Sequence, residues 1–157
     1  MFKIIISDLS RVILFPKDRS YYGSLNSFYS EHCKEPNFNF WNYYEINQEY
    51  LDFLKTLKLK LKLILFTSGS IQNTKELQFK LLEIFEELLN PAIVGFNKDK
   101  KEAYTSVAKR YNVNTNEMIL IDDDKSFVEA ARQASVKIIR YSGDNRILFL
   151  VLNQIIN

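Results

Sequence analysis

The chain has 157 residues, a length that fits one domain and leaves no room for a second of ordinary size. Its 46% hydrophobic and 25% charged residues exclude a disordered, collagen-like or coiled-coil protein. The net charge of +2 is too small to indicate a nucleic-acid partner by itself. With only 4 glycines and 3 prolines, the chain marks few of its turns clearly.

The single cysteine, Cys33, and the single histidine, His32, limit the chemistry that is open to the chain. A lone cysteine excludes disulfides within the chain and fits a reducing compartment. These two residues are too few to complete a Cys/His zinc site. No apolar run approaches the roughly 20 residues that a membrane span needs. We therefore expect a cytoplasmic protein without a membrane or nucleic-acid partner, and the sequence leaves a homo-oligomer open.

Short apolar runs alternate along the chain with apolar stripes at helical spacing. In chain order, the pattern predicts strands at 2–6 and 12–15, a helix at 25–34, a helix capped by Asn47 and reaching Leu57, a strand at 63–66, a helix at 70–89, a strand at 92–96, a helix at 104–111, a strand at 118–121, a helix at 127–134, a strand at 136–141 and a helix at 147–156. Strands and helices alternating in this way form βαβ units. The sequence predicts a single α/β domain over 1–157 with a central parallel sheet and a small irregular or helical insert at 16–46.

Polar side chains follow four of the predicted strands: they are Asp8, Thr67 with Ser68, Lys98, and Asp122 with Asp123. Ligands of open α/β sheets bind at the carboxyl ends of the strands, so these side chains are expected to converge. Carboxylates brought this close repel unless one is neutral or a cation lies between them. Oxygen ligands of this kind suit Mg²⁺, and a lysine with hydroxyl and backbone donors suits a phosphoryl group.

Each of these pieces also has an ordinary structural explanation. An aspartate at a strand end is most often a turn or cap residue, and a run of aspartates is often a solvated turn. A serine-rich segment after a strand usually caps a helix, and lysines in a charged run are usually solvated. The joint arrangement, in this order and at strand ends, is more specific than any of its parts.

Four segments of the chain resemble the motifs of the haloacid dehalogenase (HAD) superfamily, in the order of that family. Residues 4–14 (IIISDLSRVIL) resemble the first motif, in which a strand delivers a nucleophilic aspartate. Residues 65–68 (LFTS) are similar to the second motif, and residues 98–104 (KDKKEAY) resemble the third, although the usual prolines are absent. Residues 119–131, with ILIDD followed by VEAA, resemble the fourth. The resemblance implies a Rossmann-like, HAD-like three-layer sandwich.

The resemblance implies a role for each matched carboxylate. Asp8 would attack phosphorus and form an aspartyl-phosphate, which is covalent catalysis. Mg²⁺ would be bound by Asp8, the backbone carbonyl of Ser10 and the carboxylate of Asp123. Asp122 would lie beside the metal or bind it through water.

The resemblance also implies how a phosphorylated substrate is held. Thr67, the backbone of Ser68 and the ammonium group of Lys98 would bind the phosphoryl oxygens and offset charge in the transition state. The chain between Asp8 and Thr67 is too short for an independent cap domain. Similarity to capless members implies an open site, large substrates, or closure by another subunit. The aromatic-rich residues 28–53 are interpreted as packing, with a lid or partner surface as the alternative.

Ser10 is the main departure from the family pattern, because the phosphatases usually carry an aspartate there as general acid and base. A serine hydroxyl is a poor acid at neutral pH, and losing such a group typically costs about 10²- to 10⁴-fold in rate. The loss should be greatest for alkyl phosphates and least for acyl or aryl phosphates. The resemblance thus implies a Mg²⁺-dependent phosphatase impaired at this step, and a catalytically inactive binding module of the same fold is the alternative.

Two other classes fit the residues less well. A phosphoreceiver domain needs its acidic pair at the first strand and its lysine after the last, whereas the order here is Asp, Thr, Lys, Asp-Asp. Dehalogenases of the superfamily also lack the second aspartate, but they dispense with the metal that Asp122 and Asp123 suggest.

Overall fold

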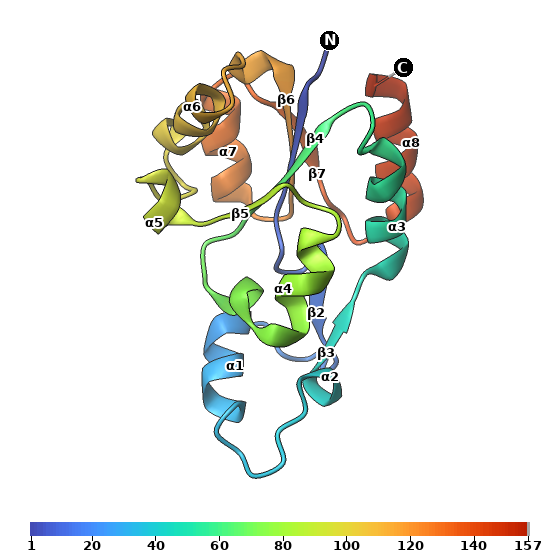
Figure 1. Ribbon diagram of the computed structural model, residues 1–157, viewed down its shortest axis with the longest axis vertical. Coiled ribbons are helices and arrows are strands. Elements are labelled where there is room, and N and C mark those ends of the chain that lie inside the picture. The colour runs from blue at the N-terminus through green and yellow to red at the C-terminus, as the bar shows by residue number, and fades with distance from the viewer. Residues whose placement is uncertain (157) are drawn as a thin grey trace.

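Five parallel strands form the central sheet of the protein, in the order β5–β4–β1–β6–β7 (Figure 1). They are β1 (Ile4–Ser7), β4 (Lys62–Phe66), β5 (Glu87–Leu89), β6 (Met118–Asp122) and β7 (Lys137–Arg140). The structure is a computed structural model that describes residues 1–156. β1 lies in the middle of the sheet and pairs with β4 on one side and β6 on the other. The predicted α/β fold with a central parallel sheet is confirmed.

The central strand is buried on both faces. Ile4, Ile5 and Ile6 have no exposed surface. Ile5 packs into one hydrophobic cluster, whereas Ile4 and Ile6 pack into a second cluster on the other face. A strand of a parallel sheet covered by helices on both faces reads as a continuous apolar run, which is why the sequence predicted β1 correctly.

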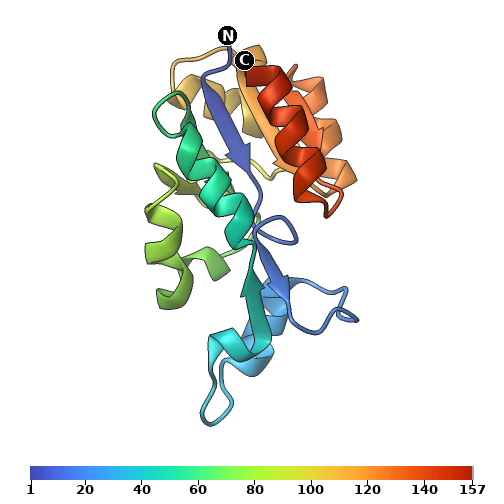
Figure 2. The ribbon, with the colours of Figure 1, turned by 90° about the vertical axis from the view of Figure 1, so that its right-hand side faces the viewer.

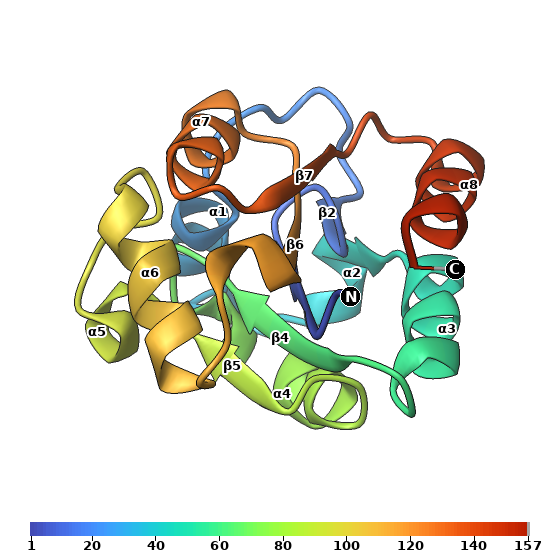
Figure 3. The ribbon, with the colours of Figure 1, turned by 90° about the horizontal axis from the view of Figure 1, so that it is seen from above.

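Helices cover the two faces of the sheet, as the view from above shows (Figure 3). One face packs against α3 (Gln48–Leu57), α4 (Lys75–Leu82) and α8 (Asn145–Ile156). The other packs against α5 (Pro91–Val94), α6 (Lys101–Arg110) and α7 (Lys125–Gln133). Short 3₁₀ turns occupy Ile71–Asn73 and Thr115–Glu117. None of the helices among residues 1–156 has the length and apolar character needed to cross a membrane.

The insert between β1 and α3 lies beyond the carboxyl ends of the central strands (Figure 2). Its strand β2 (Leu14–Pro16) pairs antiparallel with β3 (Tyr44–Ile46), and this ribbon carries α1 (Leu25–His32) and α2 (Phe40–Tyr43). Aromatic rings fill its interior, with Phe40 stacked on Tyr44 at a centroid distance of 4.5 Å. Both residues are 1% exposed, so packing accounts for this part of the aromatic stretch.

Two predicted elements between Ser70 and Phe96 are wrong. The helix predicted at 70–89 is broken into a 3₁₀ turn and α4, and its last three residues are the edge strand β5. The strand predicted at 92–96 is instead the short helix α5. Asn90 caps this helix by accepting from the backbone N–H of Ile93, and Pro91 is preset for the first turn. Gly95 ends it at φ 88°, a conformation that glycine adopts without strain.

Asn47 caps α3, as the sequence predicted. Its Oδ1 accepts from the backbone N–H of Tyr50 at 3.2 Å. Its Nδ2 donates to the Tyr141 hydroxyl at 3.1 Å and to Asn145 at 3.0 Å, and Asn145 donates back. These bonds join the end of the insert to Tyr141, which follows β7, and to the start of α8.

Candidate active site

The central strands deliver three of the predicted site residues to one edge of the sheet. Asp8 follows β1, Thr67 follows β4, and Asp122 is the last residue of β6. The backbone N–H of Asp8 donates to the carbonyl of Ile121 at 2.9 Å, which extends the pairing of β1 with β6 by one residue. This bond fixes Asp8 beside Asp122, because neighbouring strands lie about 4.8 Å apart.

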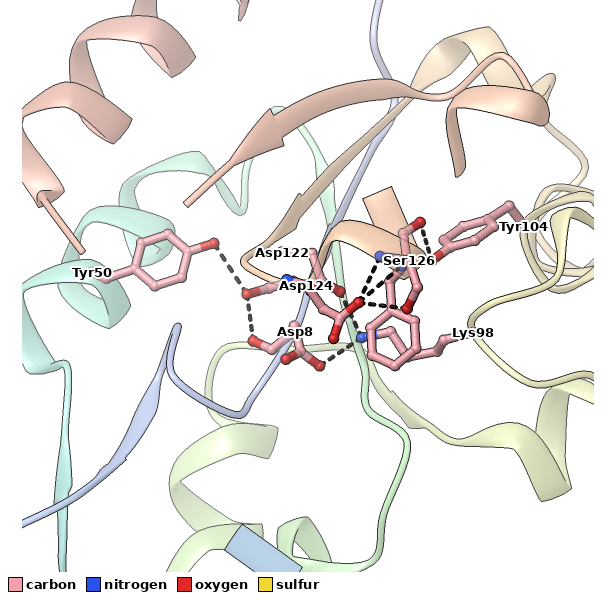
Figure 4. Close-up of polar contacts among 9 residues, drawn as sticks. Asp8, Tyr50, Lys98, Tyr104, Asp122, Asp124 and Ser126 are labelled. Carbon is pink, nitrogen blue, oxygen red and sulfur yellow. Dashed lines mark hydrogen bonds and ion pairs between the residues drawn. The ribbon is translucent and has the colours of Figure 1, made fainter. Parts of the chain in front are cut away.

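The ammonium group of Lys98 lies between two of these carboxylates (Figure 4). Its Nζ is 2.6 Å from Oδ1 of Asp8 and 2.8 Å from Oδ2 of Asp122. Lys98 is 1% exposed, and the ring of Phe127 lies 4.6 Å from its Nζ. A buried ammonium group requires partners of this kind, so Lys98 and the two carboxylates form one unit.

Burial governs the protonation of this unit. It raises the pKa of Asp8 to about 7, although the positive charge of Lys98 opposes the rise. Burial by itself would lower the pKa of Lys98, but the charges of Asp8 and Asp122 outweigh it and raise that pKa. Burial and the charge of Asp122 also raise the pKa of Asp123. Three carboxyl groups thus share one ammonium group, which can balance only one negative charge.

Asp8, Asp122 and Asp123 each offer a carboxylate oxygen, and these three oxygens lie within 4.8 Å of one another. Asp122 uses Oδ2 for Lys98 and accepts from the backbone N–H of Asp124 with Oδ1. Asp8 uses only Oδ1 for Lys98, and the carboxylate of Asp123 remains available for a cation. Hard oxygen donors with uncompensated negative charge fit Mg²⁺.

Asp124, the third of the three consecutive aspartates, has a structural role. Its Oδ1 accepts from the backbone N–H of Ser126 at 2.7 Å and caps α7. This bond fixes the start of α7 and with it Phe127, which packs on Lys98. Tyr104 on α6 also holds Phe127 in place, because its hydroxyl donates to the carbonyl of Phe127 at 3.2 Å.

A cavity of about 230 Å³ opens over Asp8. Among the residues predicted for the site, its lining includes Asp8, Ser10, Ser68 and Asp123. Lys98 and Asp122 lie beneath this surface and are bonded to Asp8 or to each other. Thr67 is 1% exposed and is not part of the lining. The structure thus gathers six predicted residues, and it places Thr67 at the adjoining strand end without a hydrogen bond to them.

The insert supplies a wall of this cavity through Ser24, Leu25 and Asn26. Oδ1 of Asn26 accepts from the backbone N–H groups of Ser70 at 2.9 Å and Ile71 at 3.0 Å. A Cβ atom at Gly69 would lie 2.0 Å from Nδ2 of Asn26, so the close approach of the two segments requires glycine there. Asn26 was not among the predicted site residues, because no local pattern marks a contact across 44 positions.

Arg11 is a second residue that sequence analysis missed. It adopts φ 57°, in the left-handed region that non-glycine residues seldom occupy. Its Nη2 donates to the backbone carbonyls of Gly23 at 2.8 Å and Tyr21 at 3.1 Å, and its side chain lines the cavity. Its place directly after Ser10 in the first motif was the available signal.

Comparison with solved structures shows the same fold in several proteins of low sequence identity. A HAD family enzyme from Bacteroides thetaiotaomicron, solved as a magnesium complex, has a TM-score of 0.68 and 16% identity, covering 94% of this chain and 98% of that one. A HAD-like family hydrolase from Porphyromonas gingivalis has a TM-score of 0.63 and 14% identity, covering 98% of each chain. A HAD-superfamily hydrolase of subfamily IA from Geobacter sulfurreducens has a TM-score of 0.66 and 15% identity, covering 89% and 87%.

Comparison with curated proteins gives no match. Comparison with family models matches residues 30–135 to a model described as haloacid dehalogenase-like hydrolase. That span holds Thr67, Lys98, Asp122 and Asp123 and begins after Asp8. Because it covers more than half of the sequence, the chain belongs to the haloacid dehalogenase-like hydrolase family.

Proposed function

We propose that the protein is a Mg²⁺-dependent phosphatase in which Asp8 accepts the phosphoryl group. The observation that carries the proposal is the buried ammonium group of Lys98, which binds Asp8 and Asp122 beneath an open cavity that Asp123 also lines. Membership of the hydrolase family supports it. The similar enzyme of Bacteroides thetaiotaomicron was solved with magnesium and inorganic phosphate.

The chemistry needs one oxygen of Asp8 to be free and the other to be fixed. Lys98 fixes Oδ1, and the second oxygen attacks the phosphorus atom while the bond to the leaving oxygen breaks. Water then attacks the phosphorus of the aspartyl-phosphate, which releases phosphate and regenerates the Asp8 carboxylate. Mg²⁺, held by Asp8, Asp123 and the backbone carbonyl of Ser10, would supply positive charge to the phosphoryl oxygens.

Lys98 contributes a permanent positive charge next to the reacting oxygen. The charges of Asp8 and Asp122 keep its pKa above the ordinary value, so the group stays protonated through neutral pH. A cation fixed in a site that excludes water stabilises transition-state charge without reorganisation. Ser68 lines the cavity, and we assign to it and to Thr67, which follows β4, the binding of the phosphoryl oxygens.

No side chain in the cavity lining replaces the missing general acid. The carboxylates of the lining besides Asp8 are Asp123, assigned to the cation, and Asp124, which caps α7. Ser10 supplies only a hydroxyl. We therefore propose that the enzyme acts on acyl or aryl phosphates, whose leaving groups need no proton. The same residue favours the second candidate, a binding module that retains phosphate and Mg²⁺ affinity without turnover.

We also propose that the chain works as one cytoplasmic domain whose insert, residues 16–46, forms part of the site rather than an independent cap. The contacts of Asn26 with Ser70 and Ile71, and of Arg11 with Gly23, support this interpretation. The site is expected to remain open enough for phosphorylated molecules of different sizes.

The decisive experiment measures hydrolysis of acetyl phosphate and p-nitrophenyl phosphate with Mg²⁺ and with EDTA. We expect turnover by the parent protein with Mg²⁺ alone, and loss of at least about 10³-fold in Asp8→Asn. Asp99→Asn is the matched control, because Asp99 is exposed and pairs only with Lys100. Turnover that survives in a folded Asp8→Asn protein contradicts the assignment, and phosphate binding without turnover supports the binding module.

A further inference from the structure

A second cavity adjoins the one over Asp8. It measures about 490 Å³ and is lined by Arg11, Asp123, Arg140, Tyr141, Ser142 and Gly143. Arg11 and Asp123 line both cavities, so the two meet along this pair of residues. A molecule with a phosphoryl group at Asp8 can therefore extend past Arg11 into the second cavity.

Two guanidinium groups give the second cavity its charge. Arg11 donates from Nη2 to the backbone carbonyls of Tyr21 and Gly23. Arg140 donates from Nε to the backbone carbonyl of Asp123 at 3.3 Å. These acceptors are uncharged carbonyls, so neither arginine forms an ion pair with an acidic side chain of the described residues, and both have further N–H donors to offer. The carboxylate in the same lining is that of Asp123, on which the charge of Arg11 acts.

The other arginines of the chain are each paired with an acidic side chain: they are Arg19 with Glu45, Arg110 with Glu87, Arg132 with Glu129, and Arg146 with Asp144. Among residues 1–156, the two arginines that form no such ion pair are therefore the two that line this one cavity. Arg11 is also held at φ 57° by a bond from its own N–H to the carbonyl of Leu14 at 2.8 Å. Such a backbone conformation costs free energy in a non-glycine residue, and it directs this side chain to the boundary of the two cavities.

We propose that this second cavity binds a second anionic group of the substrate, a carboxylate or a phosphate. The proposal rests on the phosphatase function given above and narrows its substrate class to phosphorylated molecules that carry another acidic group. The planar fork of arginine matches both groups and binds them through charge-assisted hydrogen bonds. Asp123 is the one carboxylate in this lining, and the cation assigned to it would offset its charge.

The test uses non-hydrolysable probes, so that binding is measured without turnover. Phosphonoacetate and 3-phosphonopropionate carry a phosphonate and a carboxylate, and ethylphosphonate and propylphosphonate are their matched forms without the carboxylate. Calorimetric titration of the Mg²⁺-loaded protein should show at least one phosphonocarboxylate binding about tenfold more tightly than its match. Methylenebisphosphonate, titrated at saturating Mg²⁺, shows whether phosphate is preferred to carboxylate as the second group.

Arg140→Ala is the principal variant, since Arg140 is exposed and its removal leaves no buried charge. We expect it to bring the phosphonocarboxylate and its match to equal affinity, and to change the affinity for ethylphosphonate by less than about twofold. Arg146→Ala is the matched control, because Arg146 is exposed, pairs with Asp144 and lies outside the lining. It should preserve the preference of the parent protein.

The outcomes separate this proposal from the one on which it rests. Equal binding of matched probes by the parent protein, or a preference that survives in Arg140→Ala, overturns the second subsite while the phosphatase function stands. If no phosphonate binds and no aryl phosphate is hydrolysed, both proposals are wrong.

Discussion

Nζ of Lys98 and Oδ1 of Asp8 lie 2.6 Å apart in the interior of the protein, 90 positions apart in the sequence. The ammonium group also binds Asp122 at 2.8 Å, and Phe127 covers it. This contact joins the loop before α6 to the end of the central strand. It links the stability of the fold to the charge of Asp8, and the first two predictions follow from it.

Replacing Lys98 by methionine should destabilise the protein by about 3 kcal/mol or more, because two buried carboxylates lose their cation. Chemical denaturation of the metal-free protein measures this change. Lys100→Met provides the matched control, since Lys100 is exposed and pairs only with Asp99, and its effect should stay within about 0.5 kcal/mol. Equal stability of the two variants would show that Lys98 does not hold the carboxylates together.

The stability of the metal-free protein should depend on pH through Asp8. Burial raises its pKa in the folded protein to about 7, against an ordinary value of 3.8. Between these values the folded state binds the proton more tightly than the unfolded chain, so the contribution of Asp8 is present below about pH 4 and is lost as the pH rises through about 7. We expect the unfolding free energy of the parent protein, relative to Asp8→Asn, to fall by a few kcal/mol between about pH 4 and pH 8.

EDTA keeps both proteins free of metal. Subtracting the unfolding free energy of Asp8→Asn removes the contributions of the other carboxylates, which both proteins share. Several of these carboxylates have lowered pKa values, so their contributions change with pH in the opposite direction. Asp144 is one of these, because the hydrogen bond from Arg146 lowers its pKa. A difference between the parent protein and Asp8→Asn that stays constant across the range would mean that Asp8 titrates near its ordinary value.

Restoring a general acid at position 10 should change the order of substrates. In Ser10→Asp we expect the rate on an alkyl phosphate to rise about 10²-fold or more and the rate on p-nitrophenyl phosphate to rise much less, because only the alkyl leaving group needs a proton. Ser30→Asp, on the exposed surface of α1, controls for the added charge. A folded Ser10→Asp protein that binds Mg²⁺ but turns over neither ester would favour the binding module.

Removing the side chain of Asn26 should loosen the loop that follows β4. Asn26→Ala leaves the N–H groups of Ser70 and Ile71 without their acceptor, and we expect a loss of about 1–2 kcal/mol in stability. KM for p-nitrophenyl phosphate should rise more than kcat falls, because the loop contributes binding. Asn26→Asp keeps the acceptor and should restore KM toward the parent value, whereas Asn42→Ala, on an exposed residue, should change neither quantity.

Sequence patterns predicted those parts of the fold that local physics determines. Residues 4–6 are apolar on both faces, so β1 could be predicted as a central strand. β5 could not, because it has three residues and continues the apolar spacing of the helix before it. The same limit explains the error at 92–96, where the cap Asn90 and Pro91 determine a helix in a segment rich in β-branched residues.

The sequence predicted which residues would lie near one another in the site, but not how they contact each other. Strand ends placed Asp8 and Asp122 at one edge of the sheet, but no pattern indicated that Lys98 binds both carboxylates. The wall formed by Asn26 and the second cavity beside Arg140 depend on contacts between distant segments. Such contacts depend on how the insert packs on the sheet, which residue spacing does not encode.

The hydrogen bonds of Asn47 have a consequence for local unfolding. They join the end of the insert to Tyr141, which lines the second cavity, and to Asn145, the first residue of α8. Because one asparagine serves both segments, opening either of them breaks the same bonds. Amide hydrogen exchange should therefore report a single cooperative opening for β3 and the loop at 141–144, slower when phosphate and Mg²⁺ occupy the site.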